Sequence, residues 1–286
     1  MKIILSRKGL DSSFGGGPSV VLPNGYIVSA PIPGDQDEIP YSQVYSGFQR
    51  QSVYDILSSV SSTVLYNGER KKWDMDTRCH LDPDLAWSSY PRSLNWRGAF
   101  GQADAAQSVL EHAHIEPEDI FLFFGWFQQT EYKDGKLRLC KGGGFHMIYG
   151  YLEIGQIFYT SKNKGKYPEW LMYHPHMLPR RIDKPSNCIY IGTQQASWNR
   201  DIPGFGVFTD FDPELVLTAP GMSRSKWHLP SEFRGLKITY HDPEKSWRKD
   251  YFQSACRGQE FVFEENSDVE IWAKHIIEKH IDIKKG

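Results

Sequence analysis

The chain has 286 residues, 40% of them hydrophobic and 24% charged, which argues against a disordered chain and allows a substantial core. The formal net charge of −2 argues against a broadly basic nucleic-acid-binding surface, and no apolar run approaches the roughly 18 residues that a membrane helix needs. The four cysteines form no Cys-x-x-Cys pair, which argues against a disulfide framework or a cysteine zinc site, so we expect a cytoplasmic protein with free thiols.

The first elements are predicted to be short. Residues 2–6 form an apolar run that indicates a buried strand, and residues 25–32 indicate an edge strand that prolines cut short. Residues 52–59 have a weak helical pattern. Residues 67–97 are rich in acids and lack a hydrophobic period, so we expect a long functional loop there, with short helical turns.

The middle of the chain has the strongest patterns. Residues 102–114 place their apolar side chains on one helical face. Residues 120–127 are continuously apolar, as in a strand that is buried on both faces of a parallel sheet. The pair Asp134-Gly135 then predicts a hairpin between residues 121–132 and 137–159.

The second half contains short strand patterns and a terminal helix. Strands are predicted at residues 188–192, 206–211 and 215–218, and a helix at residues 269–280. There is no internal repeat and no clear linker. We therefore predict a single α/β domain over residues 1–286, with a mixed, largely buried sheet flanked by helices and long functional loops. A split near residue 160 is the alternative.

The first candidate site is the loop after the first strand. Arg7, Asp11, Ser12 and Ser13 precede a run of three glycines, and sites in α/β sheets form where strands end. Asp11 has the chemistry of a general base or electrostatic stabiliser, and the two serines that of phosphate or sugar ligands. The backbone amides of residues 15–17, including Gly15 and Gly16, would form an anion nest. The alternative is a glycine-rich turn formed by Asp11.

The second candidate site is the string from His80 to Asp84. A histidine with carboxylates at alternate positions suits shared acid–base work or metal binding, with His80 and Asp82 as the reactive pair. The alternative is an ordinary Asp-Pro-Asp turn that caps a helix starting near Leu85.

The third candidate site contains His174 and His176, which extended geometry would place on one side of the chain. His146, inside an apolar strand pattern, would complete a set of three histidines for a divalent metal. Because a histidine in an apolar strand is commonly a hydrogen-bonded core residue, this metal set is an alternative, and no cofactor is favoured.

Two further signals point to nucleic-acid recognition. Gln129 closes the buried strand and has an amide that can read a base edge, although a strand end that faces water is the more common explanation. Arg224 and Trp227 lie in a segment whose cations, hydroxyls and ring suit phosphate positioning beside a stacking platform, or an ordinary surface turn.

These strings together resemble one family. The opening Ser-Arg-Lys-Gly-x-Asp-Ser-Ser, followed by Gly-Gly-x-Pro-Ser and Ser-Ala-Pro-Ile-Pro, resembles the nucleotide-modification-associated domain of the third type. His-Leu-Asp-Pro-Asp, Phe-Phe-Gly-Trp-Phe, His-Pro-His and Trp-His-Leu-Pro follow in the same order, so the likeness covers nearly the whole chain. The resemblance implies bacterial and phage systems that handle hypermodified DNA bases, a nucleic-acid substrate and a role in defence against phage.

The leading hypothesis is a DNA N-glycosylase for a hypermodified base. Such an enzyme flips its target into a pocket and stabilises an oxocarbenium-like sugar with a carboxylate. Asp11 is the candidate carboxylate, with Asp82 or His80 as the second group, while cations and hydroxyls position phosphate or sugar. The positioning residues are Arg7, Ser12, Ser13 and Arg224.

Two alternatives stay open. The first is a non-catalytic reader that binds modified bases in DNA without turnover. The second is a metal-dependent hydrolase or transferase that acts on modified nucleotides through His146, His174 and His176. Chelation would abolish activity in the second case alone.

Overall fold

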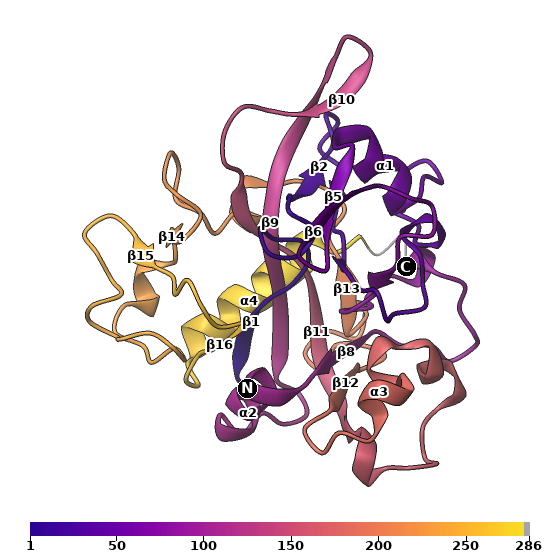
Figure 1. The fold of residues 1–286 in the computed structure, drawn as a ribbon. Coiled ribbons are helices and arrows are strands. Elements are labelled where there is room, and N and C mark those ends of the chain that lie inside the picture. Colours follow the sequence, from indigo (N-terminus) through magenta and orange to yellow (C-terminus); the bar gives the residue numbers. More distant parts are fainter. Residues whose placement is uncertain (283–286) are drawn as a thin grey trace.

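A computed structural model describes residues 1–282, which form a large curled mixed sheet with helices around it (Figure 1). Its strands are β1 Ile3–Arg7, β2 Ser19–Val21, β3 Ile27–Val28, β4 Ile32–Pro33, β5 Thr63–Tyr66, β6 Glu69–Lys72, β7 Cys79–His80, β8 Ala99–Gln102, β9 Ile120–Lys133, β10 Lys136–Leu139, β11 Phe145–Tyr159, β12 Cys188–Gly192, β13 Phe205–Val207, β14 Lys226–Trp227, β15 Phe252–Gln253 and β16 Glu260–Val262. Its helices are α1 Val53–Val60, α2 Asp104–His112, α3 Pro179–Ile182 and α4 Ser267–His280.

The main sheet has the strand order β16-β1-β9-β11-β12-β8. β1 runs parallel to β9, whereas the other neighbours along this path are antiparallel. This arrangement confirms the prediction of a mixed α/β fold. Strands from both sides of residue 160 share the sheet, because β12 pairs with β8 and β16 pairs with β1.

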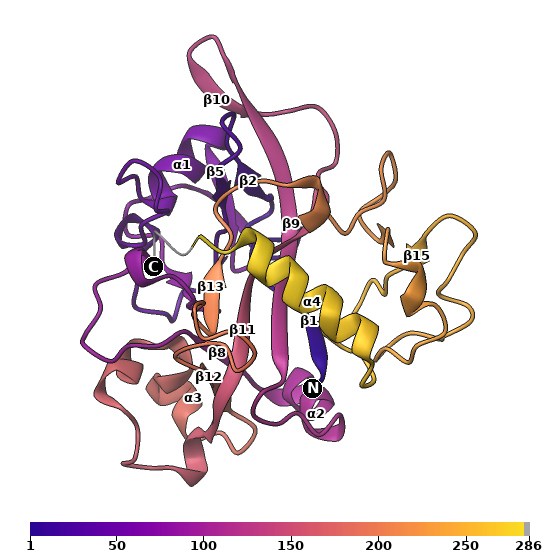
Figure 2. The same cartoon turned by 180° about the vertical axis from the view of Figure 1, so that it is seen from behind.

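The continuously apolar run in β9 is buried on both faces, as its composition predicts. Phe121 packs against Phe100 on one face of the strand, and Phe124 packs against Trp227 on the other. Helix α4 lies across the sheet on the side seen in Figure 2, where its buried side chains join the same core. The centre of the molecule is therefore a dense aromatic core around β9.

The loop after β1 connects two short strands, β1 and β2, that both pair with β9. Both β1 and β2 run parallel to β9, with Arg7 aligned to Phe124 and Ser19 aligned to Phe127. The chain therefore advances only three residues along β9 while residues 8–18 leave the sheet and return. Gly125 permits this departure, because a Cβ there would lie 2.5 Å from the backbone oxygen of Lys8.

Several predicted elements differ from the structure. Residues 25–32 are divided between β3 and β4, and the predicted long loop begins at Asn67-Gly68, the turn of a hairpin between β5 and β6. Asn-Gly is a strong hairpin signal that identifies this turn. Residues 215–218 make only isolated bridges, because Val216 pairs with Met147 alone and Thr218 with Trp227 alone.

The predicted hairpin at Asp134-Gly135 is confirmed, but its second strand is interrupted. β10 pairs with the end of β9, and β11 resumes after residues 140–144 to pair with the start of β9. The β9–β10 hairpin projects from the body of the molecule (Figure 1). Among residues 1–282, no helix has the length and apolar character needed to cross a membrane.

Candidate functional site

A cleft of about 1030 Å³ opens beside the loop that follows β1. Its walls come from that loop, from β8 and the start of α2, and from residues 223–225 and 255–259. It brings together members of all three predicted sites: Arg7, Asp11, Ser12, Ser13, His80, Asp82, His146, His176 and Arg224. Segments far apart in the sequence therefore share one cavity at the end of β1, where α/β sheets commonly bind ligands.

Asp11 shapes the loop as well as lining the cleft. Its Oδ1 accepts hydrogen bonds from the backbone N–H groups of Ser13 at 2.6 Å and Phe14 at 2.7 Å. The structure therefore contains the turn that the alternative interpretation predicted. The same carboxylate interacts electrostatically with Arg7 and Arg224, so it lies near the cationic side of the cleft.

The predicted anion nest of Gly15 and Gly16 is not available to a ligand. The N–H of Gly15 donates to the oxygen of Leu65 at 3.0 Å, and the N–H of Gly16 donates to the oxygen of Asp11 at 2.9 Å. Both residues have positive φ, +88° and +71°, which glycine adopts without strain. These two glycines therefore shape the backbone of the loop and do not bind a ligand through their N–H groups.

Asp82 is the centre of a buried group of side chains. Its Oδ1 accepts a hydrogen bond from the N–H of Gly101 at 2.7 Å and lies 3.2 Å from Nε2 of His174. Its Oδ2 lies 3.9 Å from Nε2 of His80 and from Nε2 of His176. Burial raises the pKa of Asp82, but the neighbouring histidines, His174 first, outweigh burial and hold this pKa well below its usual range.

The rings of His80 and His176 are each fixed by a partner at Nδ1. His80 Nδ1 lies 3.1 Å from a carboxylate oxygen of Asp37, which also binds Arg180 at 2.8 Å. His176 Nδ1 lies 2.6 Å from Oδ1 of Asn187. Burial lowers the pKa of His176 well below its usual value, so the ring is neutral at pH 7.

The structure groups a different metal-ligating set from the predicted alternative. Among residues 1–282, His80, Asp82 and His176 present ligand atoms within 4.8 Å of one another. His174 instead uses Nδ1 to accept the N–H of His176. His146 uses Nδ1 to accept the indole N–H of Trp227 at 3.1 Å. Of the three predicted histidines, only His176 belongs to the convergent set.

Another part of the cleft lining is cationic and aromatic. The guanidinium of Arg224 stacks 3.8 Å from the centre of the Trp126 ring. Arg7 donates to the backbone oxygens of Ala255 at 2.8 Å and Cys256 at 3.1 Å, and burial lowers the pKa of both arginines. Stacked guanidinium groups of this kind suit phosphates and bases.

The sequence of residues 2–264 matches the family model described as nucleotide modification associated domain 3. The chain belongs to this family. The match includes every residue that lines the cleft, and it confirms the resemblance that the motifs indicate. No curated protein and no solved structure matches the chain. Membership implies a part in nucleotide modification systems and therefore an action related to nucleic acids.

Besides Gly15 and Gly16, two more residues predicted to bind substrate do not line the cleft of this nucleotide modification domain. Trp227 is 1% exposed and packs against Phe124 in the core, so its ring is not a stacking platform. Gln129 is exposed on β9 beyond the cleft. Trp126, an aromatic residue that does line the cleft, was not among the residues predicted from the sequence, because the apolar pattern of β9 indicates only a buried strand.

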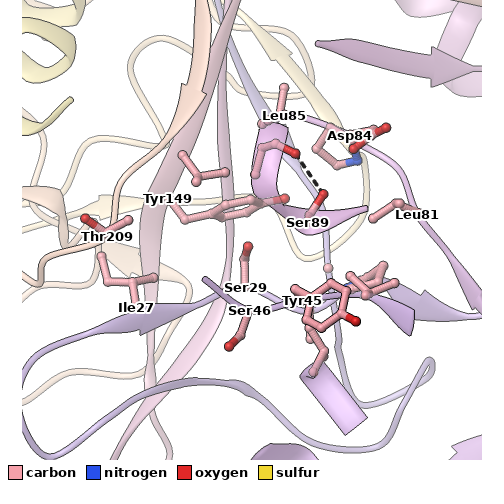
Figure 3. Close-up of a pocket in the computed structure, with 18 of the residues that line it drawn as sticks. Ile27, Ser29, Tyr45, Ser46, Leu81, Asp84, Leu85, Ser89, Tyr149 and Thr209 are labelled. Atoms are coloured by element: carbon pink, nitrogen blue, oxygen red, sulfur yellow. Dashed lines mark hydrogen bonds between the residues drawn. The ribbon is translucent and has the colours of Figure 1, made fainter. Parts of the chain in front are cut away.

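A second, smaller cavity of about 70 Å³ adjoins the cleft of the domain through Gly9 and Asp82, which line both. Figure 3 shows Ser29, Tyr149 and Asp84 around it. Asp84 is held by a buried ion pair with Arg92, with one N–O distance of 2.7 Å. No helix begins at Leu85, where one alternative predicted it, because Asp84 pairs through its backbone with Ala99 and a 3-10 turn follows at Trp87–Ser89.

Proposed function

We propose that this protein is a hydrolase that acts on a modified nucleotide of DNA, which it binds in the cleft. One observation carries the proposal: a buried carboxylate, Asp82, lies beside two imidazoles in a cleft that arginines also line. A carboxylate and imidazoles in a water-poor site are suited to activating water. The cations balance the phosphate charge of a nucleotide.

The N-glycosidic bond is the first candidate for hydrolysis. A sugar that loses its base develops positive charge, and a carboxylate close to the sugar stabilises that charge. Asp11 is our candidate for this role, because its Oδ1 accepts the two amides of the turn while the carboxylate lines the cleft. His80 and Asp82 are our candidates for the group that delivers water. Ser12 and Ser13 line the same wall and would bind sugar or phosphate.

A non-catalytic reader of modified bases is the second candidate. The stack of Arg224 on Trp126 favours it, because such a platform binds a base or phosphate without any chemistry. Both candidates fit a protein that acts on modified DNA, and a role in defence against phage stays a prediction.

The test is incubation of the purified protein with DNA that carries hydroxymethylated or glucosylated cytosine, beside unmodified DNA. Mass spectrometry of the small-molecule fraction then identifies a released base, nucleoside or nucleotide. We expect free modified base from modified DNA alone. Release of nucleotides would move the reaction to the phosphodiester, and binding without any product would favour the reader.

Asp11→Asn tests the proposed carboxylate. Asparagine retains a side-chain oxygen for the N–H groups of Ser13 and Phe14, so the turn persists while the charge is lost. We expect kcat/KM to fall by roughly 10²–10³-fold with an unchanged melting temperature. Asp134→Asn, at the tip of the exposed β9–β10 hairpin, is the matched control. Full activity of Asp11→Asn would remove Asp11 from the reaction.

A further inference from the structure

We propose that His80, Asp82 and His176 bind one divalent transition-metal ion, of the Zn²⁺ or Fe²⁺ class, at the boundary of the cleft. The three side chains come from β7, from the segment that follows it and from the 3-10 turn Pro175–Met177. All three are at least nine-tenths buried, and all three line the cleft. The argument depends on which atoms of these side chains remain free after their other hydrogen bonds are made.

The hydrogen bond of His80 leaves its Nε2 free to bind an ion. Asp37 accepts at His80 Nδ1 with both carboxylate oxygens, at 3.1 and 3.2 Å. An ionised carboxylate only accepts hydrogen bonds, so Nδ1 must carry a proton. In the neutral ring Nε2 therefore holds a lone pair. A carboxylate on the far nitrogen is the usual support of a metal-bound histidine.

The same reasoning applies to His176, through the amide of Asn187. The Nδ2 of Asn187 donates to Oγ1 of Thr160 at 2.9 Å and to the backbone oxygen of His176 at 2.8 Å. These two acceptors fix the amide with Oδ1 toward the ring, 2.6 Å from His176 Nδ1. Nδ1 must donate that hydrogen bond, so His176 Nε2 also holds a lone pair.

Asp82 completes the set with Oδ2. Its Oδ1 takes the N–H of Gly101 and lies beside Nε2 of His174. His174 accepts the N–H of His176 at Nδ1, so its proton is on Nε2, which lies 3.2 Å from Oδ1 of Asp82 without the alignment of a hydrogen bond. His174 is therefore a positioning residue for the carboxylate and not a ligand.

The result is a group of three acceptor atoms, none of which carries a hydrogen: Nε2 of His80, Oδ2 of Asp82 and Nε2 of His176. Oδ2 of Asp82 lies 3.9 Å from Nε2 of each histidine, too far for a hydrogen bond. Nη1 of Arg181 approaches Nε2 of His176 only to 3.5 Å, the outer limit of a hydrogen bond. Lone pairs that face one another in a buried site repel, and a cation among them converts this repulsion into binding.

The spacing fits an ion after a modest adjustment. Ligand atoms that bind one zinc ion at about 2.0–2.2 Å are about 3.0–3.5 Å apart. The two separations of 3.9 Å between Asp82 and the histidines need to close by about 0.5 Å, and all three ligand atoms already lie within 4.8 Å of one another. Two imidazoles and one carboxylate favour Zn²⁺, Fe²⁺ or a similar ion over Mg²⁺ or Ca²⁺, which prefer oxygen ligands. Three protein ligands leave coordination positions open toward the cleft.

The role of the ion in the reaction rests on the proposed function, whereas its binding does not. Water on such an ion loses a proton at neutral pH. In glycosidic hydrolysis the hydroxide oxygen bonds to the sugar carbon C1′ as the bond from C1′ to the base nitrogen breaks. The electron pair of that bond stays with the base, which takes up the proton that the water released.

Titration of the chelator-treated protein with Co²⁺ tests the binding, with visible absorption and elemental analysis as measurements. We expect one Co²⁺ per chain, and at least 100-fold weaker binding in His80→Gln and His176→Gln. Glu214→Gln is the matched control, because Asp212, Glu214 and His280 form the other convergent group among residues 1–282. Loss of Co²⁺ binding in this control alone, or full binding in both histidine variants, would overturn the proposal.

X-ray absorption of the Co²⁺-loaded wild-type protein tests the site even where a variant fails to fold. We expect two imidazoles and oxygen ligands. A sulfur ligand, a single imidazole or no stoichiometric Co²⁺ would overturn the proposal. Bound metal without any product from modified DNA would refute the hydrolase and leave the metal site standing. Product from a fully chelated protein would show that the ion takes no part in the reaction, and it would leave the proposed hydrolase standing.

Discussion

The histidines of this protein differ in which ring nitrogen is engaged. His80 and His176 each donate from Nδ1 to a side-chain oxygen, which leaves Nε2 as the acceptor nitrogen of each ring. His174 and His146 instead accept at Nδ1, from a backbone N–H and an indole N–H. A neutral imidazole has one donor and one acceptor, so this difference separates two candidate ligands from two structural histidines.

A single residue, His146, also makes the free energy of unfolding depend on pH. Burial and the nearby cations Arg7 and Arg224 lower its pKa to about 3, against about 6.5 in an unfolded chain. The folded state therefore binds the proton less well, so this contribution to stability is present above pH 6.5 and is lost as the pH falls toward 3. We expect a loss on the order of 2 kcal/mol between pH 7 and pH 5.

His146→Asn tests this expectation, because asparagine can accept the indole N–H of Trp227 but does not titrate. Urea unfolding at pH 7 and pH 5 should show a smaller pH dependence in this variant than in the wild type. His114→Asn, at an exposed position, should retain the wild-type dependence. Equal pH dependence in all three proteins would show that the ring of His146 is not the titrating group.

Among the secondary-structure elements, β8 does the most to organise the candidate site. Gly101 in this strand donates its N–H to Asp82, and its missing side chain leaves room for the ring of His176. A Cβ at this position would lie 2.3 Å from that ring, so His176 would have to move. One edge strand therefore positions two of the three proposed ligands.

Gly101→Ala should displace His176 while leaving the N–H of residue 101 in place. We expect about 10–100-fold weaker Co²⁺ binding, as is typical when the support of a ligand is disturbed. Gly17→Ala is the control, because a Cβ there has no atom within 4 Å. Calorimetric titration of both variants measures the effect, and wild-type affinity in Gly101→Ala would count against the predicted displacement.

For the molecule as a whole, the net charge is small, but positive side chains are concentrated in the cleft. The net charge is −2, yet the cleft gathers arginines that include Arg7, Arg224 and the exposed Arg257. A protein that contacts two or three phosphates of single-stranded DNA loses affinity with a slope of log K against log salt of about −1.4 to −2. We expect a slope in this range, shallower than that of strongly basic DNA-binding proteins.

Arg257→Gln should reduce the size of this slope by about 0.7, the value for one phosphate contact. Lys133→Gln, on the exposed β9–β10 hairpin, should leave it unchanged. Fluorescence anisotropy with a labelled single strand at several salt concentrations measures both. A slope that falls equally in the two variants would indicate that DNA does not bind in the cleft.

The sequence by itself determined the elements whose signals are local. The apolar run of β9, the amphipathic pattern of α2 and the hairpin at Asp134-Gly135 lie within short windows, so periodicity and turn chemistry identify them. The motifs also identified the family, and with it an involvement in nucleotide modification. The same local signals concealed Trp126, since a ring that lines a cleft looks like any other apolar residue of a strand.

Only the tertiary structure decided which polar side chains meet and which of their atoms stay free. His80 is paired with Asp37, Asp82 with Gly101, and His146 with Trp227, residues that lie 43, 19 and 81 positions apart. No local window contains such pairs. The tautomer of a histidine, the charge of a buried carboxylate and the burial of Trp227 all follow from contacts that form only when the sheet brings distant segments together.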